Sequence, residues 1–383
     1  MISRSSINGK YPVRRLGALV EFLDSRRKPV TESDRKAGAY PYFGANGQQG
    51  TIDDFLFDEP LVLLAEDGGH FETPERGIAY RIRGKTWVNN HAHVLRPKQE
   101  ICLDYLCRVL ENYDVSPFVT GTTRGKLTKG GAEQIPIPLP PLPEQRRIAA
   151  ILDKADDLRA KRRTVLERLS SLTQAMFFEM FGDPATNPSG WTMVPIGDLL
   201  ESASYGTSEK AGDVGALPIL RMGNVTASGD IDRTNLKFID LKESDFERYT
   251  VRVGDVLFNR TNSPDLVGKT AIVRSSTPTA FAGYLIRLRT NAECHPEYLS
   301  AFLNTAYAKR VLRGMCKAII GMANINATEI QRMDIPKPTL SLQQTFARAV
   351  AGIEHQKDVH RAAVLMNDSL FSALQHQAFA GEL

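Results

Sequence analysis

The chain contains an internal duplication, which limits its possible folds more than any single motif does. The segment Ile135–Gln145 resembles Asp334–Gln343, and the resemblance continues downstream at one constant offset. The matched pairs are Pro138 and Pro336, Pro140 and Pro338, Leu142 and Leu340, Gln145 and Gln343, Ile148 and Phe346, and Phe181 and Phe379. Upstream, Leu16–Glu21 resembles Ile196–Glu201. Several matches in the same order indicate two copies of one unit and a pseudo-two-fold internal repeat.

Each copy predicts a mixed α/β globular part, then a proline-rich hinge and one long helix. Short apolar runs at Leu61–Leu64 and Asp255–Phe258 are typical of strands, whereas Tyr105–Leu110 and Tyr298–Leu303 have helical spacing. A length of 383 residues suggests two or three domains. The predicted fold class is therefore α+β, with two similar mixed α/β domains and two long helices.

The two long helices carry an apolar seam in steps of three and four residues, which is the pattern of a coiled coil. In the first helix, which has no proline or glycine between Pro143 and Gly182, the seam comprises Ile148, Ile151, Ala155, Leu158, Val165, Leu169, Leu172 and Met176, with Arg162 as its polar member. In the second helix the seam comprises Phe346, Ile353, Ala363, Leu370 and Leu374, with His360 and Asn367 as polar members.

Such a seam needs a covering partner, and we expect the two helices to pair with each other because each lacks another obvious partner. Polar seam residues weaken a coiled coil but fix its register. The alternative is that each helix packs on the sheet of its own domain.

No catalytic or metal-binding pattern stands out. The loop Gly121–Thr128 has three residues instead of four between its glycines, and Leu127 stands where a P-loop requires serine or threonine. His91 and His93 lie near Cys102 and Cys107 without a zinc spacing, so we interpret them as polar strand residues. We therefore predict no catalytic residue and no metal ligand.

Composition restricts the setting without revealing the function. The net charge is +4, which is compatible with nucleic-acid binding but does not indicate it. The sequence shows no membrane-length apolar run and no signal peptide, so we expect a cytoplasmic protein. Its four cysteines are scattered, and we expect them to be reduced.

Four strings resemble those of one known family. They are Tyr40–Gly50, Gly254–Pro264 followed by Leu266–Lys269, Pro138–Gln145 at the start of the central helix, and Met180–Asp183 at its end. In this duplicated arrangement the chain resembles the specificity subunits of type I restriction-modification systems across nearly its whole length.

The resemblance implies target-recognition domains at residues 1–141 and 183–339, with spacer helices at 142–182 and 340–383 packed antiparallel. It implies that each domain reads one half of a split, asymmetric site in double-stranded DNA and that the helices dock two modification subunits. Those subunits would carry S-adenosylmethionine, and a restriction subunit would use ATP and Mg²⁺. No cofactor and no catalysis are expected in this chain.

The length of the helices agrees with that role. A helix of roughly 39 residues is about 58 Å long at ~1.5 Å per residue. This length exceeds one DNA turn of about 34 Å. We therefore expect the helix pair to set the distance between the two half-sites.

Side chains that donate to bases or phosphates are the candidate DNA contacts. In the first half these are Asn46, Gln48, Gln49, Arg124, Lys126 and Lys129, and in the second half they are Arg221, Asn224, Arg260, Asn262, Lys269, Asn324 and Asn326. The alternative is that the asparagines are ordinary turn residues. The basic run Arg159–Arg163 is better explained as a solvated or partner-facing helix surface than as a phosphate contact.

Two other functions remain open at the level of sequence. The duplicated helices are also what a structural adaptor needs to bridge two partner subunits without reading DNA. The chain is alternatively an enzyme of a fused restriction system, which would bind S-adenosylmethionine by itself.

Overall fold

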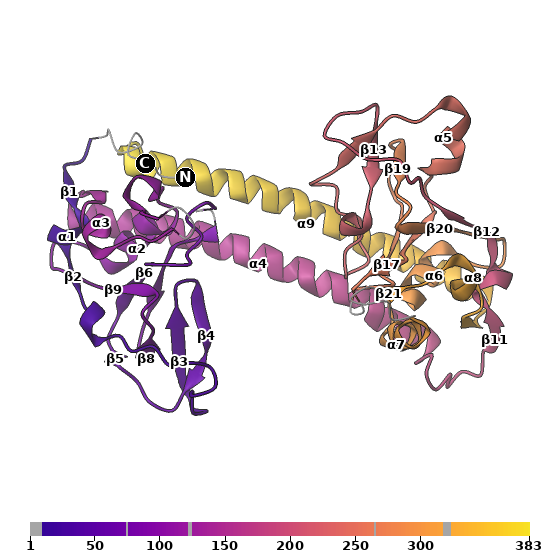
Figure 1. Cartoon of the computed structure of the whole chain (residues 1–383), viewed down its shortest axis with the longest axis horizontal. Coiled ribbons are helices and arrows are strands. Elements are labelled where there is room, and N and C mark those ends of the chain that lie inside the picture. Colours follow the sequence, from indigo (N-terminus) through magenta and orange to yellow (C-terminus); the bar gives the residue numbers. More distant parts are fainter. Residues whose placement is uncertain (1–9, 74–75, 122–124, 264–265, 317–322) are drawn as a thin grey trace. The chain divides into compact units, whose positions relative to one another are not determined.

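The computed structural model describes residues 10–73, 76–121, 125–263, 266–316 and 323–383 (Figure 1). These residues form two compact units. Unit 1 comprises residues up to 163 together with 363–383, and unit 2 comprises residues 164–362. Each long helix therefore contributes one segment to each unit.

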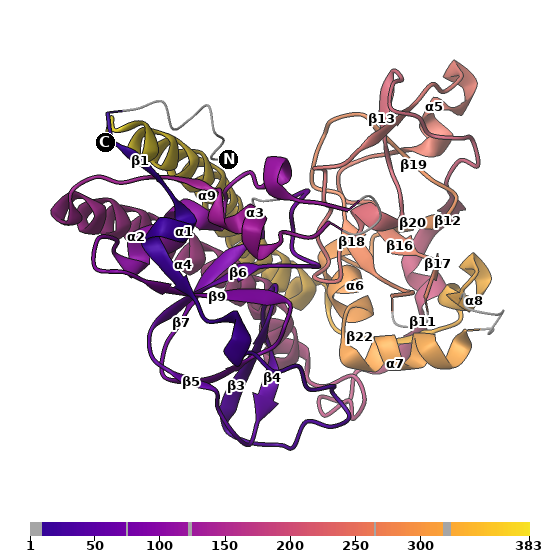
Figure 2. The same cartoon turned by 60° about the vertical axis from the view of Figure 1, so that its left-hand side comes forward.

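Unit 1 contains two four-stranded sheets and three short helices. Its first sheet has the order β2 (Val20–Phe22), β9 (Ala92–Pro97), β6 (Leu61–Ala65) and β7 (Ala79–Ile82). Its second has the order β4 (Gly47–Ile52), β3 (Tyr40–Gly44), β8 (Lys85–Val88) and β5 (Phe57–Asp58). The remaining elements are β1 (Val13–Arg15) paired with β10 (Pro136–Pro138), and helices α1 (Leu16–Leu19), α2 (Leu103–Glu111) and α3 (Lys129–Glu133). In both views the β3–β4 hairpin lies at the end of unit 1 away from α2 (Figures 1 and 2).

Unit 2 repeats this plan. Its first sheet has the order β12 (Leu200–Tyr205), β20 (Leu285–Thr290), β16 (Val256–Asn259) and β18 (Thr270–Ile272). Its second has the order β14 (Lys237–Ile239), β13 (Leu217–Leu220), β19 (Thr279–Phe281) and β15 (Thr250–Val251). Two further pairs are β11 (Thr192–Pro195) with β22 (Asp334–Lys337), and β17 (Thr261–Asn262) with β21 (Ala323–Asn324); the short helices are α5 (Glu243–Tyr249), α6 (Pro296–Leu303), α7 (Ala306–Met315) and α8 (Ala327–Gln331).

The shared strand order confirms the duplication inferred from the sequence. Each second sheet contains one parallel pair, β3 with β8 in unit 1 and β13 with β19 in unit 2, among antiparallel neighbours. This mixture of strands and helices in both units is the predicted α+β class.

The central strand β6 shows why an unbroken apolar run folds as a strand here. Successive side chains of a strand point to opposite faces. Val62 and Leu64 enter the core shared with α2, whereas Leu61 and Leu63 enter a second core that holds Phe57. Because both faces are covered, this strand has no polar alternation.

Two long helices, α4 (Leu142–Phe181) and α9 (Leu340–Ala380), pack together as expected (Figure 1). In unit 1 the first segment of α4 contributes Ile148 and Leu152 to a core that includes Phe371 and Phe379 of α9. In unit 2, Phe181 of α4 contacts Phe346 of α9 with ring centroids 5.3 Å apart. The core of each unit thus contains residues of both helices. Each helix packs against the other helix and also into a globular core, so both packing alternatives from the sequence apply.

The seam predicted from the sequence is partly wrong. Ile148, Phe346 and Ile353 are buried, but Leu158, Leu172 and Leu370 are 49%, 42% and 54% exposed. The half-buried members are Ile151, Ala155, Arg162, Val165, Leu169, Met176, His360, Ala363, Asn367 and Leu374.

Helix geometry explains the error. A straight helix turns roughly 20° per heptad away from a 3.5-residue repeat. Over the four heptads that follow Ile148 this drift amounts to about one residue position. The fully buried side chain near the end of α4 is accordingly Phe177 and not Met176. Arg159 rather than Leu158 faces α9, where its Nε atom lies 2.6 Å from Asp368 Oδ1.

A buried glutamine fixes the start of each long helix. Gln145 Oε1 accepts a hydrogen bond from the backbone N–H of Cys102 at 2.7 Å, and its Nε2 donates to the carbonyl oxygens of Glu100 and Pro140. Gln343 repeats all three bonds in unit 2, with the N–H of His295 and the carbonyls of Glu293 and Pro338. Both side chains are 0% exposed, so the glutamine of the proline-rich motif has a structural role.

No helix among the described residues has the length and apolar character that crossing a lipid bilayer requires.

We expect Gln145→Ala to lower the free energy of unfolding by about 1–3 kcal/mol because it leaves the buried carbonyl of Pro140 and two part-buried backbone groups without this partner. Denaturant titration of the full chain measures this loss. Gln344→Ala is the matched control, since Gln344 is the exposed neighbour of the equivalent Gln343, and it should change stability by less than about 0.5 kcal/mol. Equal losses in the two variants would contradict the role assigned to this glutamine.

Candidate nucleic-acid interface

A cleft of about 1100 Å³ lies in unit 2, at the ends of several strands. Its walls are the segments that follow β12, β13, β16 and β19 in the chain. Its polar lining comprises Thr207, Ser208, Glu209, Lys210, Arg221, Arg260, Thr261, Lys269, Tyr284 and Asn324. Four of these side chains are basic and one is acidic, so the cleft favours an anionic ligand.

The structure brings together four of the residues that the sequence suggested for the second half: Arg221, Arg260, Lys269 and Asn324. The Lys269 ammonium donates to the carbonyl of Met222 at 3.2 Å, and burial lowers the pKa of Lys269. Arg221 donates to the carbonyl of Asn235 at 3.4 Å. These backbone contacts hold the basic side chains within the cleft and leave further donors available.

Local backbone geometry creates the cleft. Gly206 lies so close to the carbonyl oxygens of Phe281 and Ala282 that a β-carbon would come within 2.4 Å of both. This approach brings the segment after β12 against the segment after β19. The segment between β16 and β18 is held by the bonds from Asn259 N to the carbonyl of Lys269 and from Gly268 N to the carbonyl of Asn259.

A further lysine lies beside the cleft. Lys309 of α7 donates to the carbonyl of Gly268, which precedes Lys269. Burial and the charge of Lys269 together lower the pKa of Lys309 to about 7. Sequence reasoning missed Lys309, Lys210 and Tyr284, since only the folded chain brings them near the predicted residues.

Two asparagines of the second half have structural roles. Asn224 is 5% exposed, accepts from the N–H of Arg221 and donates to the carbonyl of Asp232, which favours the turn-residue alternative over a DNA contact. Asn326 caps α8 by accepting from the N–H of Glu329, which is the turn-residue alternative for this position. Asn262 lies in β17, and its side chain is outside the described residues.

The first-half candidates lie on a hairpin and on a loop. Asn46, Gln48 and Gln49 are exposed on the β3–β4 hairpin, where Asn46 donates to the carbonyl of Gly68 at 2.9 Å. The amide oxygen of Gln49 accepts from Asn89 at 3.2 Å.

The basic candidates of the first half lie at the start of α3. The Lys126 ammonium lies 3.1 Å from Glu66 Oε1, and the exposed Lys129 lies 3.8 Å from Glu133. Arg124 lies outside the described residues.

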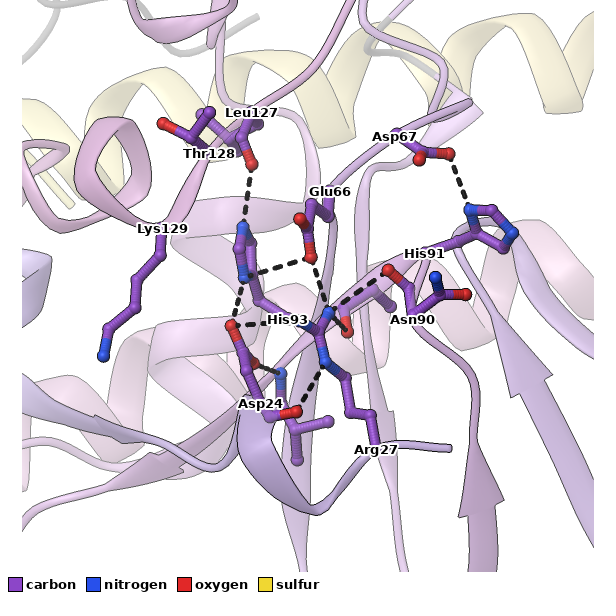
Figure 3. A network of polar contacts seen from close by, with 12 residues as sticks. Asp24, Arg27, Glu66, Asp67, Asn90, His91, His93, Leu127, Thr128 and Lys129 are labelled. Atoms are coloured by element: carbon purple, nitrogen blue, oxygen red, sulfur yellow. Dashed lines mark hydrogen bonds and ion pairs between the residues drawn. The ribbon is translucent and has the colours of Figure 1, made fainter. Parts of the chain in front are cut away.

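A network of charged side chains fills the corresponding position of unit 1 (Figure 3). The Nδ1 atom of His93 is 2.7 Å from Asp24 Oδ2, and its Nε2 is 2.8 Å from the carbonyl oxygen of Leu127. Arg27 donates to Glu66 at 2.6 Å. Asp24, Glu66 and His93 lie close enough together to suggest a metal site, but Arg27 and the two ring bonds of His93 occupy the space between them. We interpret the group as an ion-pair network.

The network lowers the pKa of both carboxyl groups. Burial by itself would raise the pKa of Asp24, but the hydrogen bond and charge of His93, the N–H of Val94 and the charge of Arg27 together outweigh this effect. For Glu66 burial is likewise outweighed, mainly by hydrogen bonds from Arg27 and Lys126. His91, the other histidine of this segment, lies 2.7 Å from Asp67. Both histidines thus have carboxylate partners.

Comparison with known proteins shows which proteins this chain is similar to. Residues 8–168 match the model of the type I restriction modification DNA specificity domain. The specificity subunit of the EcoKI type I restriction enzyme of Escherichia coli is 25% identical over 315 residues, which cover 76% of this chain and 68% of that subunit. The chain is therefore similar to the specificity subunits of type I restriction-modification systems over most of its length, and its residues 8–168 match the DNA specificity domain of that family. This similarity agrees with the resemblance found in the sequence and does not favour the adaptor alternative.

The match varies along the chain. A protein of Haemophilus influenzae named as a type I restriction enzyme specificity subunit is 39% identical over 138 residues, so that the alignment spans 35% of its length. A solved type I restriction-modification S subunit from M. genitalium covers 97% of this chain and 96% of its own with a TM-score of 0.62 at 13% identity. Specificity subunits thus share this fold even where little sequence identity remains.

We expect the ion-pair network to make unit 1 sensitive to acid. Because the pKa of Asp24 is lowered on folding, its contribution is present at neutral pH and disappears as the pH falls below about 4. Asp24→Asn should therefore cost about 3 kcal/mol at pH 7, since it leaves His93 buried without its carboxylate. Denaturant titrations from pH 7 to pH 2 should show the difference from the unsubstituted chain shrinking with acid.

The matched control for this prediction is Asp53→Asn, because Asp53 is exposed in the same unit. Its unfolding free energy should follow that of the unsubstituted chain at every pH. A difference between Asp24→Asn and the unsubstituted chain that stayed constant down to pH 2 would refute the assignment.

Proposed function

We propose that this chain is the DNA-reading subunit of a type I restriction-modification complex and acts in the cytoplasm. Unit 1 binds one half of a split, asymmetric site in double-stranded DNA, and unit 2 binds the other half. The chain itself holds no cofactor and catalyses no reaction. The observation that carries the proposal is the cleft of unit 2, where basic side chains meet at the strand ends.

The chemistry of the cleft supports DNA as the ligand. Arginine and lysine donate to phosphate oxygens and to the acceptors of guanine in the major groove, whereas tyrosine and asparagine make further polar contacts. The cleft contains all four residue types. The exposed amides of Asn46, Gln48 and Gln49 offer unit 1 the donors and acceptors that adenine recognition uses.

We infer that the long helices dock two modification subunits. Leu158, Leu365, Met366 and Leu370 are large apolar side chains that α4 and α9 leave exposed within unit 1. Apolar side chains grouped on a helix surface are typical of a protein interface. The modification subunits would bind S-adenosylmethionine, and restriction subunits would use ATP and Mg²⁺.

Selection from a random duplex pool tests the proposal, with the full chain in complex with a modification subunit. We expect the selected duplexes to share two short motifs separated by a gap of fixed length. A pool without any common motif would favour the adaptor function. Methyl transfer or S-adenosylmethionine binding by the purified chain alone would instead favour a fused enzyme.

We expect the gap to depend on the length of the helices. Deleting one heptad from each, at residues 161–167 and 360–366, removes about 10.5 Å of helix at ~1.5 Å per residue. The preferred gap should shrink by about three base pairs, since the axial rise of DNA is ~3.4 Å per pair. Selection with the deletion variant measures the new gap.

The control for this prediction keeps the helix length. The deletion removes Leu365 and Met366 of the proposed docking surface, so the control carries Leu365→Ala and Met366→Ala at full helix length and should select the original gap. A deletion variant that folds, binds and still selects the original gap would refute the spacer role.

A further inference from the structure

Glu66 of unit 1 and Arg260 of unit 2 occupy the same place in the duplicated fold. Glu66 follows β6, its N–H donates to the carbonyl of His91, and its carbonyl accepts from the N–H of Leu127. Arg260 follows the equivalent strand β16, its N–H donates to the carbonyl of Tyr284, and its carbonyl accepts from the N–H of Ile325. The two backbones are therefore matched bond for bond, while the side chains have opposite charge.

The carboxylate of Glu66 is fully engaged within unit 1. One oxygen lies 2.6 Å from Arg27 and the other 3.1 Å from Lys126, and the side chain is 12% exposed. Its acceptors are thus satisfied by the protein itself. This position in unit 1 has no free donor with which to bind a ligand.

The guanidinium of Arg260 is in the opposite situation. It lines the cleft and lies over the ring of Tyr205, with 4.8 Å between its central carbon and the ring centroid. Its Nε atom is buried and has no hydrogen-bond partner. Among the described residues no carboxylate forms an ion pair with it. A guanidinium that is held in place but not neutralised is prepared for an acceptor that the chain does not supply.

We propose that Arg260 reads a guanine in the half-site bound by unit 2 and that unit 1 has no counterpart at this position. The inference rests on the proposed function and assigns a base to that same site. Guanine presents its O6 and N7 acceptors side by side in the major groove, and the two parallel donors of arginine match them. The carboxylate at the equivalent position of unit 1 repels the same acceptors.

The position of Arg260 favours a base over a phosphate. It is half-buried between Asn259 and Thr261, which are 0% and 7% exposed, so it lies in the deep part of the cleft. Lys210 is exposed on the same lining and is better placed for the DNA backbone. A half-buried guanidinium with a fixed plane suits the paired acceptors of a guanine edge, whereas the flexible ammonium group of an exposed lysine suits a phosphate.

Tyr205 is the positioning residue for Arg260. Its ring supports the guanidinium, and its hydroxyl accepts from the N–H of Ala327 at 2.8 Å, which fixes the ring at the start of α8. Stacking on an aromatic ring fixes the plane of a guanidinium and leaves its donor edge free.

The test uses the full chain in complex with a modification subunit and compares duplexes selected from a random pool. The unsubstituted chain should select an invariant guanine in one half-site. With Arg260→Ala this position should become degenerate, and discrimination against the other bases should fall about 10- to 100-fold. The other half-site should keep its motif. Arg260→Lys should recover only part of the discrimination because lysine lacks the paired donors.

Two further measurements separate base reading from a structural or phosphate role. Tyr205→Phe keeps the ring and should retain the preference for guanine, whereas Tyr205→Leu should lose most of it. Replacing the invariant guanine by 7-deazaguanine removes one acceptor, so it should weaken binding by the unsubstituted chain without affecting Arg260→Ala. The measurement with the unsubstituted chain needs no protein variant, so it does not depend on whether Arg260→Ala folds.

The inference is overturned if Arg260→Ala weakens all duplexes equally with an unchanged motif, which is the behaviour expected of Lys210→Ala at a phosphate. Indifference of the unsubstituted chain to 7-deazaguanine at every guanine of its motif overturns it as well. If the unsubstituted chain selects no motif at all, the proposed function fails together with the inference. A two-part motif that is unaffected by Arg260→Ala refutes the inference alone.

Discussion

The rest of the structure depends on the way in which each long helix leaves its globular domain. A single glutamine at the first turn, Gln145 in one copy and Gln343 in the other, binds three backbone groups that come from the hinge and from the loop before α2 or α6. Because the hinge carbonyls of Pro140 and Pro338 are buried, a helix that left in another direction would deprive them of this partner. Tyrosines at equivalent positions bind the hinge from the other side, Tyr105 at Pro138 and Tyr298 at Pro336.

The two copies of the fold share their backbone scaffold but differ in the side chains at the ends of their central strands. The strand order and the hydrogen bonds that end each central strand are the same in both units. The side chains at those strand ends differ, with Glu66 neutralised in unit 1 and Arg260 supported by an aromatic ring in unit 2. These strand-end side chains lie outside the apolar core, so they can differ between the two units while the scaffold stays the same.

The apolar side chains of the long helices are partly buried and partly exposed. Each unit takes one segment of α4 and one of α9 into its core, through Phe371 in unit 1 and Phe346 in unit 2. Leu158 and Leu370 remain exposed although the sequence placed them at the helix pair. The apolar content of these helices therefore exceeds what the chain itself buries.

The sequence alone determined the duplication, the α+β class and the extent of the two long helices. These features follow from local chemistry, since α4 ends at Phe181 where Gly182 adopts a positive φ angle, and an unbroken apolar run is compatible with a strand buried on both faces. The tertiary structure decided which side of each helix is buried, because a drift of one residue position over several turns depends on packing. It also decided that Arg260 meets Tyr205 while Asn224 is buried. Contacts between distant segments depend on the sheet order, which residue spacing along the chain does not encode.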